Sequence, residues 1–315
     1  MDRPVLLLRV AEAEAISRGL RRLTLVDAHG ARLPPAAPGA HITLSLPVPG
    51  HARPLKNSYT VVSADPERGY TLIVRRTDHS RGGSHYIHDA MRQGDLLEAS
   101  VPHNLFALHS QARKFLLIGG GIGVTPLLAF VAQLRARGAR FELHQICAAD
   151  DTPVFAALLG AQPGEAVHLH SGRGGFDAAG VLAAQPLGTH VYSCGPAALM
   201  DAVAAQAAAL GWPSSHVHRE DFGAAGGEPF TLTIGSTGAR IAVAADQTML
   251  EAIEAAGIDA ASLCRGGACG VCAVPVRSGD LEHRDHYLSA GERKSGKIVM
   301  PCVSRARGDA LVLDL

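Results

Sequence analysis

The sequence predicts a multi-domain chain that joins an antiparallel β-barrel, an α/β domain with a parallel sheet and a small α+β segment. Three observations support this prediction: a length of 315 residues with 47% hydrophobic content, a change of hydrophobic period after Pro102, and a cysteine cluster near the C-terminus. A chain of this length and composition can bury two or three cores of ordinary domain size.

The first hundred residues show the alternation that is typical of short strands. Leu23 and Leu25 are separated by a polar residue, residues 42–46 alternate in the same way, and a further apolar run covers 71–74. Pro and Gly residues lie between these segments, as expected for turns. This pattern favours an antiparallel barrel.

After Pro102 the apolar segments become strands that alternate with helices. One helix is expected at 127–137, closed by Gly138. The alternation predicts a parallel sheet with crossover helices. The expected strands are at 115–118, 141–146, 167–169 and 191–193.

The remainder of the chain begins with a linker. Residues 223–228 are rich in Gly and Ala, and beyond them lies a β-rich segment with one expected helix at 248–256. Nothing in this segment repeats an earlier part of the chain. Aromatic residues make up only 4% of the sequence, and two of them, Tyr59 and Phe222, are expected in loops.

The charge pattern argues against nucleic acid and membrane partners. The chain has 29 basic and 29 acidic side chains and no run of five or more Lys and Arg, so it lacks the basic surface that phosphate backbones require. The apolar run at the N-terminus is too short for a signal peptide, and no apolar stretch reaches 18 residues. We therefore expect a cytoplasmic protein.

Four of the six cysteines have the plant-type spacing of ligands for a 2Fe-2S cluster. Cys264, Cys269 and Cys272 form a C-x4-C-x2-C motif, and Cys302 follows after 29 further residues. A reducing compartment disfavours disulfides. The spacing therefore predicts four thiolate ligands, while Cys147 is expected in a core.

The cysteine loop also contains glycines that are expected to let the backbone fold tightly around the cluster, namely Gly266, Gly267 and Gly270. Three alternatives compete with the cluster. A zinc site usually needs two paired knuckles, a redox C-x-x-C needs a helix after a strand, and four core cysteines need no particular spacing. The cluster is favoured over all three.

A second motif in this segment imitates a catalytic iron site. His283 and Asp285 match the His-x-Asp part of a non-haem iron triad, but no histidine follows His286. We expect residues 283–285 to form a solvated turn. The sequence has no Cys-x-His pair either, so a Rieske centre is absent and any oxygen chemistry must occur on another protein.

Residues 114–127 lead from an apolar strand through a glycine turn into a helix that Thr125 and Pro126 open. The free N–H groups and the dipole of such a helix start favour a pyrophosphate. The alternative is a tight strand–helix connection that binds no ligand. Pro126 occupies the third glycine position of G-x-G-x-x-G, which argues against a standard Rossmann turn. The glycines of the turn are Gly119, Gly120, Gly121 and Gly123.

Several motifs accompany this turn, namely NSYT at 57–60, RGGS at 81–84, YSCGP at 192–196 and HREDF at 218–222. Together with the cysteine loop, they make nearly the whole chain resemble the phthalate dioxygenase reductase family. The resemblance implies four parts: a flavin-binding β-barrel at 1–108, an NAD-binding α/β domain at 109–222, a linker at 223–228 and a plant-type 2Fe-2S ferredoxin domain at 229–315.

The resemblance also implies a function. Electrons pass from NADH through FMN to the 2Fe-2S cluster and then to a separate Rieske-type terminal oxygenase, and we expect the chain to be a monomer. The flavin lies between the other two because it accepts an electron pair and releases single electrons. Alternatives are a cytochrome P450 or di-iron monooxygenase as acceptor, or a non-catalytic iron-sulfur redox sensor or zinc-stabilised module.

The family motifs assign the flavin site. Tyr59 is expected against the flavin ring, with the Thr60 hydroxyl near N5, and an ordinary Tyr-Thr pair in a strand is the alternative. Asn57 replaces the arginine that the family motif carries, and Lys56 or Arg53 is the candidate for supplying the lost positive charge. Because of this replacement, FAD is an alternative to FMN as the bound flavin. The flavin phosphate is expected at consecutive backbone N–H groups and a hydroxyl, from Arg81, Gly82, Gly83 and Ser84, although RGGS by itself suits a surface turn equally well.

The motifs likewise assign the nicotinamide site. Cys194 is expected near the hydride path with Thr125 facing it, and a buried structural cysteine is the alternative. Asp150 and Asp151 follow the second strand of the α/β domain with no adjacent arginine, which favours NADH over NADPH, and Arg173 is the residue that opposes this. Gly195 and Pro196 complete this site. Glu220 and Phe222 resemble the family's E-x-F segment, where the chain is expected to pass the flavin edge before it enters the ferredoxin domain.

Overall fold

The computed structural model describes residues 5–51, 53–78, 82–162, 164–172, 174–222 and 226–315. The chain divides into two compact units. The first unit contains Met1–Leu46, Tyr59–Ser80 and Ser84–Asp221, and the second contains Pro47–Ser58, Arg81–Gly83 and Phe222–Leu315. The four-part division at 108, 222 and 228 remains a prediction.

An antiparallel sheet of eight strands forms the N-terminal part, in the order β4-β3-β7-β1-β2-β6-β5, with β8 paired to β3. Alternate residues of its strands are buried, as in Leu23 and Leu25, because successive side chains point to opposite faces. This confirms the expected antiparallel architecture. The strands are β1 (Val5–Ser17), β2 (Leu20–Asp27), β3 (Ala40–Leu46), β4 (Leu55–Thr60), β5 (Ser63–Asp65), β6 (Gly69–Arg75), β7 (Leu96–Ser100) and β8 (His103–Asn104), with the short helices α1 (Gly83–His85) and η1 (Tyr86–Ala90) before β7.

A five-stranded parallel sheet, ordered β11-β10-β9-β12-β13, completes the first unit. The predicted strands lie inside the observed ones, and Gly138 has a φ of 59° just after the end of α2, as a helix-closing glycine should. The elements are β9 (Lys114–Gly120), α2 (Val124–Ala136), β10 (Phe141–Cys147), α3 (Thr152–Leu159), β11 (Ala166–Ser171), α4 (Ala178–Ala183), β12 (Thr189–Cys194), α5 (Ala197–Ala209) and β13 (Val217–Glu220), with short 3-10 turns η2 (Gly121–Gly123), η3 (Ala149–Asp151) and η4 (Ser214–His216).

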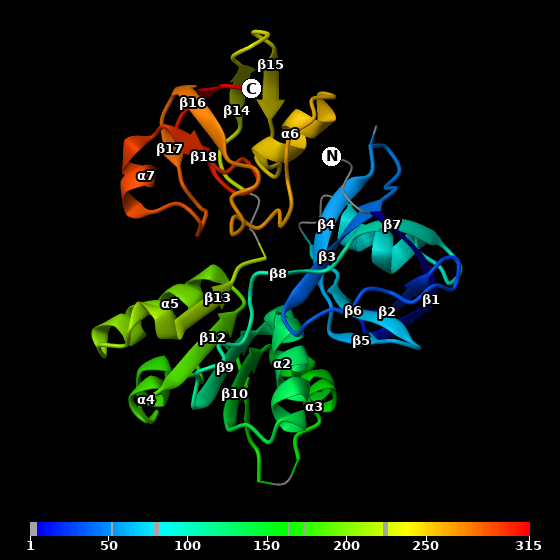
Figure 1. Ribbon diagram of the computed structural model, residues 1–315, viewed down its shortest axis with the longest axis vertical. Coiled ribbons are helices and arrows are strands. Elements are labelled where there is room, and N and C mark those ends of the chain that lie inside the picture. The colour runs from blue at the N-terminus through cyan, green and yellow to red at the C-terminus, as the bar shows by residue number, and fades with distance from the viewer. Residues whose placement is uncertain (1–4, 52, 79–81, 163, 173, 223–225) are drawn as a thin grey trace. The chain divides into compact units, whose positions relative to one another are not determined.

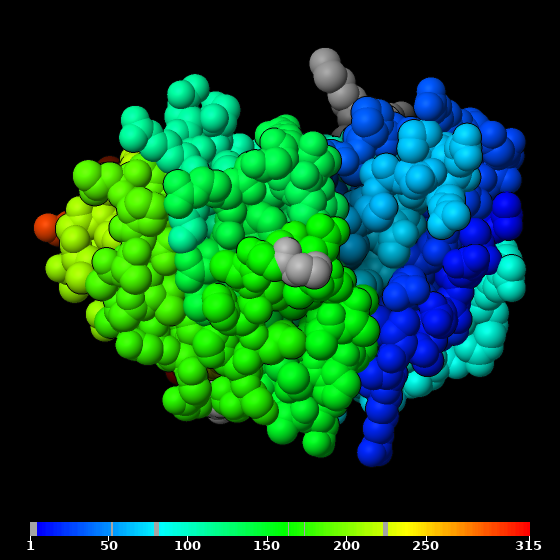
Figure 2. Space-filling view, turned by 90° about the horizontal axis from the view of Figure 1, so that it is seen from below, coloured from blue at the N-terminus to red at the C-terminus, as the bar shows by residue number. Residues whose placement is uncertain are grey.

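Helices cover both faces of this parallel sheet, with α2 and α3 on one side and α4 and α5 on the other (Figure 1). Phe130 of α2 and Phe155 of α3 pack into one core. Leu182 of α4 and Val203 of α5 pack into another. Figure 2 gives another view, in which the residues of this sheet and its helices form the green surface. The layered arrangement follows from right-handed crossover connections between parallel strands.

The second unit contains a mixed sheet in the order β15-β14-β20-β16-β18 and a small ladder of β17 with β19. Its core includes Phe230, Ile253 and Val299. Helix α6 begins with a capping box in which Thr248 and Glu251 satisfy each other's backbone N–H groups. The elements are β14 (Phe230–Ile234), β15 (Arg240–Val243), α6 (Met249–Ala255), β16 (Val274–Ser278), β17 (Leu281–Glu282), α7 (Ala290–Ser295), β18 (Ile298–Val299), β19 (Arg305–Ala306) and β20 (Ala310–Leu313).

No helix among the described residues is long and apolar enough to span a membrane.

Candidate functional site

The four clustered cysteines come together in the second unit as two pairs. The Sγ atoms of Cys272 and Cys302 are 3.3 Å apart, and the thiol of Cys269 hydrogen-bonds to Cys264. Three of the four are buried, and Cys269 is half-buried. The pairing brings Cys302, which is distant in sequence, to the loop that carries the other three.

Backbone N–H groups point at these sulfur atoms. Gly266 N lies 3.4 Å from the Sγ of Cys264. The hydrogen bond from Cys269, with backbone N–H groups in support, holds the pKa of Cys264 at about 5 in spite of burial. A set of four soft sulfur donors with N–H groups around them suits a 2Fe-2S cluster, so the residues present fit that group.

The loop backbone is more strained than its glycines alone suggest. Gly267 and Gly270 have φ values of 74° and 76°, but Gly266 is not in the left-handed region, which corrects the expectation for that glycine. Instead Arg265 has a φ of 53°, unlike every other non-glycine residue described. Its guanidinium binds both carboxylate oxygens of Glu254 at 2.8 and 2.7 Å, and this bidentate pair stabilises the strained residue.

The expectation of a solvated turn at residues 283–285 is wrong. Asp285 is 1% exposed and accepts a hydrogen bond from Leu288 N at 2.8 Å. A Cβ added to Gly267 would lie 3.1 Å from the Asp285 Cα, so this segment packs directly under the cysteine loop. Its role is to support the loop, and the carboxylate is held there because it has a backbone donor to bind.

In the first unit, the glycine turn after β9 packs against the end of β12. A Cβ on Gly123 would lie 2.2 Å from the Cys194 carbonyl oxygen, and one on Gly120 would lie 2.6 Å from Pro196 Cδ. Gly195 has a φ of 153° and lies similarly close to Gly120. The glycines are therefore needed so that two backbone turns can meet, and within the turn Gly121 alone contributes a left-handed φ, of 54°.

No side chain caps the start of α2, where Gly123 is the N-cap residue. The N–H of Val124, the first residue of α2, donates to Gly121 O in the preceding turn, so the helix dipole and the remaining N–H groups of the first turn are what favour an anion here. Pro126 is buried in the first turn, where it costs no hydrogen bond. The Thr125 hydroxyl donates to Ile122 O at 3.0 Å, so it is fixed within the turn.

Cys194 and Glu220 end two neighbouring strands of the parallel sheet and lie opposite each other in the β12–β13 register. Cys194 is fully buried. Burial, followed by the Glu220 and Asp221 carboxylates, raises the pKa of its thiol well above the usual range. Burial also raises the pKa of Glu220 to about 8, and one of its carboxylate oxygens has no hydrogen-bond partner among the described residues. Both groups are therefore neutral at pH 7.

Asp150 and Asp151 lie in η3, immediately after β10, as the sequence predicts. An arginine is nevertheless close in space, because Arg75 Nη2 lies 4.0 Å from Asp151 Oδ2. The same guanidinium would lie 3.1 Å from a Cβ on Gly121. Sequence reasoning missed Arg75 because it ends β6, far from the two aspartates along the chain. Arg173 lies outside the described residues.

The expected flavin residues are distributed over both units. Thr60 is buried at the end of β4, and Tyr59 precedes it in the same strand, so the expectation of a loop at Tyr59 is wrong. Ser84 is buried, and its Oγ accepts from Thr77 N at 3.3 Å. Gly82 has a φ of 114°, and Gly83 follows it at the start of α1.

Arg81 lies outside the described residues, and Phe222 has a half-exposed side chain. The cations near Asn57 are in the second unit. Lys56 Nζ lies 3.7 Å from Glu254 Oε1, so Lys56 is already engaged. Arg53 lines a cavity of about 300 Å³ together with Glu254 and Arg265. One further contact within the second unit is the hydrogen bond from Ser58 Oγ to Cys264 O, at 3.3 Å.

Comparisons with known proteins agree with this geometry. Residues 232–307 match the 2Fe-2S iron-sulfur cluster binding domain family. The chain is 44% identical over 311 residues to the heme-dependent oxidative N-demethylase beta subunit of Ectopseudomonas mendocina (strain ymp), covering 98% of each. It is 36% identical over 320 residues to phthalate dioxygenase reductase of Burkholderia cepacia, covering 98% of this chain and 97% of that one.

A solved structure of a phthalate dioxygenase reductase, described as modular for electron transfer from pyridine nucleotides to [2Fe-2S], matches over 99% of this chain and 98% of its own. The TM-score is 0.81 at 36% identity. The architecture and the four-thiol loop thus define a pyridine-nucleotide-dependent flavin and iron-sulfur oxidoreductase. The chain belongs to the phthalate dioxygenase reductase family.

This membership confirms the predicted class of function and cofactors. The chain is a reductase component that carries electrons from NADH through flavin to a 2Fe-2S cluster, and FMN is the flavin of phthalate dioxygenase reductase. It serves a multi-component oxygenase system. The sensor and zinc-module alternatives are thereby removed.

Proposed function

We propose that the terminal acceptor is a Rieske-type oxygenase and that the chain works as a monomer. The observation that carries the proposal is similarity along the whole chain to phthalate dioxygenase reductase, combined with an intact set of four cysteines. The cluster, once bound, supplies single electrons. Because the chain has no Cys-x-His pair, oxygen activation belongs to the partner.

On the nucleotide side, different residues bind different parts of NADH. Gly120, Gly121 and Gly123, with the uncapped start of α2, bind the pyrophosphate of NADH, because free N–H groups and the helix dipole favour an anion. Cys194 presents a neutral, buried thiol beside the nicotinamide, and Glu220 presents a neutral carboxyl group at the flavin edge. Asp150 takes the ribose hydroxyls, and Arg75 adds a cation near the glycine turn.

On the flavin side, Tyr59 and Thr60 contact the ring, while Ser84 and the N–H groups of Gly82 and Gly83 hold the phosphate. Support comes from the positive φ of Gly82 and the burial of Thr60 and Ser84. Arg81 and Phe222 are further members of the flavin site by the family motifs, and Asn57 stands where those motifs carry an arginine. The ligands of the cluster are Cys264, Cys269, Cys272 and Cys302.

A second acceptor class is favoured by one observation. The relative that is 44% identical is the beta subunit of a heme-dependent demethylase, so a haem-containing partner is the alternative to a Rieske oxygenase.

Reconstitution distinguishes the two acceptors. The purified reductase, showing flavin and iron-sulfur absorbance, is mixed with NADH and either a phthalate-type Rieske oxygenase or the haem-containing subunit of the demethylase. Substrate-dependent NADH consumption coupled to product with the Rieske protein supports our proposal. Coupled turnover with the haem protein alone overturns the Rieske assignment. Size-exclusion chromatography with light scattering checks the monomer, and a dimeric mass contradicts it.

A further inference from the structure

A cluster of two imidazoles and a carboxylate lies on the parallel sheet, away from every residue assigned above. Glu142 and His144 are on β10, and His168 is on β11 directly opposite His144 in the parallel register. One potential ligand atom from each residue lies within 4.8 Å of the others. Since residues two apart on a strand share a face, all three side chains are on the side covered by α4 and α5.

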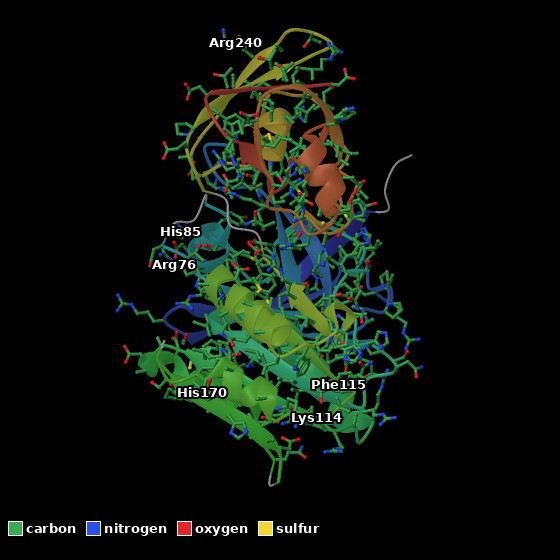
Figure 3. The ribbon with its side chains drawn as sticks, turned by 90° about the vertical axis from the view of Figure 1, so that its left-hand side faces the viewer. Arg76, His85, Lys114, Phe115, His170 and Arg240 are labelled. Atoms are coloured by element: carbon green, nitrogen blue, oxygen red, sulfur yellow. The ribbon has the colours of Figure 1, made fainter. Side chains whose placement is uncertain are left out.

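The Glu142 carboxylate is fixed in place by groups around it. Its Oε2 accepts from Lys114 Nζ at 2.6 Å and from Gln185 Nε2 at 3.2 Å. Figure 3 labels Lys114 and His170, which come from β9 and β11, the strands that flank β10. The other oxygen, Oε1, is left 2.9 Å from His144 Nε2. The carboxylate therefore presents a single oxygen toward the two histidines.

When protons are assigned to the hydrogen-bonded groups Gly175, His170, His144 and Glu142, one positive charge is missing between His144 and Glu142. His170 Nδ1 lies 3.1 Å from Gly175 O, which only accepts, so Nδ1 carries a proton. The Nε2 of a neutral His170 is then an acceptor, and His144 Nδ1, 2.9 Å away, must donate to it. That leaves the Nε2 of a neutral His144 with a lone pair facing the anionic Glu142 Oε1.

A cation between Nε2 and Oε1 removes this conflict. A proton added to His144 or to His170 is one solution. A metal ion is the other solution, and it needs the deprotonated Nε2 that the hydrogen-bond chain already produces. The arrangement Gly175–His170–His144 is the kind of outer support that orients a metal-bound histidine, and Lys114 and Gln185 orient the carboxylate in the same way.

We propose that Glu142, His144 and His168 bind one divalent transition-metal ion of the zinc type, at a site separate from the cysteine loop. Two imidazoles and one carboxylate suit Zn²⁺. Ligands about 2.0 to 2.1 Å from a tetrahedral ion are about 3.3 Å apart, so the Oε1–Nε2 pair opens by only a few tenths of an ångström. His168 is exposed, which leaves a fourth position on the ion for water. The bound ion would also link the edge strand β11 to β10.

The test uses the intact holoprotein, with flavin and cluster in place, so that the cysteines are occupied. Zn²⁺ alone is titrated by equilibrium dialysis, and zinc-edge X-ray absorption identifies the ligand atoms. We expect one zinc ion per chain with nitrogen and oxygen neighbours and no sulfur. His168→Gln, an exposed position, is expected to lower the affinity by at least about 10-fold, with unchanged iron-sulfur absorbance.

The matched control is His218→Gln. His218 also lies in the parallel sheet, with its Nε2 2.9 Å from His190 Nδ1, but that pair belongs to no three-group cluster among the described residues. Zinc affinity is expected to stay at the wild-type level. The proposal is overturned if the holoprotein binds no zinc, if the absorption spectrum shows sulfur ligands, or if both His168→Gln and Glu142→Gln bind zinc as the wild type does.

Discussion

Cys264 and Cys194 have the same side chain in opposite environments. Cys264 accepts hydrogen bonds from the Cys269 thiol and from backbone N–H groups, and its pKa is lowered to about 5. Cys194 is fully buried beside the Glu220 and Asp221 carboxylates, and its pKa is raised. The first environment lets one sulfur of the Cys264–Cys269 pair take the thiolate form while the pKa of the other is raised, whereas the second preserves a neutral thiol. Donor groups around the sulfur, and not burial alone, decide between the two.

The largest effect is expected from removing a cluster ligand. Cys272→Ser replaces a soft sulfur with a hard oxygen, so the iron-sulfur absorbance and the reduction of cytochrome c should fall to background. Flavin reduction by NADH, measured by stopped flow, should persist because the first unit has its own core, which contains none of the four cluster cysteines. Cys147→Ser, in that core, is the control and should keep the cluster. Loss of flavin reduction in a folded Cys272→Ser protein with normal flavin content would contradict the order of electron flow.

The next effect concerns the turn that packs against Cys194. Gly123→Ala places a Cβ 2.2 Å from the Cys194 carbonyl oxygen, and relieving such overpacking costs about 1 to 3 kcal/mol. We expect a lower midpoint in urea unfolding and slower flavin reduction by NADH, with the cluster spectrum unchanged. Gly174→Ala is the control, since nothing lies within 4 Å of its added Cβ. Equal behaviour of the two variants would show that the contact between the turns is not needed.

The pH dependence of stability tests the environment of Cys194. Glu220 has a pKa of about 8 in the folded chain, above its ordinary value of 4.5, so the native state binds this proton more tightly than the unfolded state. Its contribution is fully present below about pH 4.5 and is lost as the pH rises through about 8. The side chain of the Glu220→Gln variant stays neutral at every pH. The free energy of unfolding of this variant should therefore increase relative to that of the wild type as the pH rises from about 4.5 to about 8.

The gain is expected to approach about 1.4 kcal/mol for each pH unit, measured by urea unfolding at several pH values. Glu228→Gln changes a carboxyl group on an exposed side chain in the same way, and it should show no such trend. A difference between Glu220→Gln and wild type that is independent of pH would mean that the buried carboxyl is already ionised.

The smallest effect is expected from Cys194 itself. Cys194→Ala removes a neutral sulfur without leaving a charge, so flavin reduction by NADH should slow moderately while the cluster spectrum is retained. Cys194→Ser is the comparison, because it keeps a small neutral donor and should retain more of the rate. If the alanine variant reduces flavin as fast as the wild type, Cys194 is a packing residue only.

Much of the fold could be predicted because it depends on local patterns. Alternation at Leu23 and Leu25, the strand–turn–helix at 114–127 and the closing Gly138 all reflect the period of one element. Two of the errors have a common cause, which is contact between residues that are distant along the chain. Residues 283–285 look polar in sequence but pack under the cysteine loop, which buries Asp285, and Arg75 is distant from Asp151 along the chain but only 4.0 Å from it in space.

The sequence by itself determined the cysteine spacing, the glycine turn and the family, because these depend on residue type at fixed intervals. The tertiary structure decided which groups face each other. The register of β12 with β13 sets Glu220 opposite Cys194, and that of β10 with β11 sets His144 opposite His168. Such pairs come from separate strands of the parallel sheet, so their contacts and their protonation depend on sheet order and burial, which no local spacing contains.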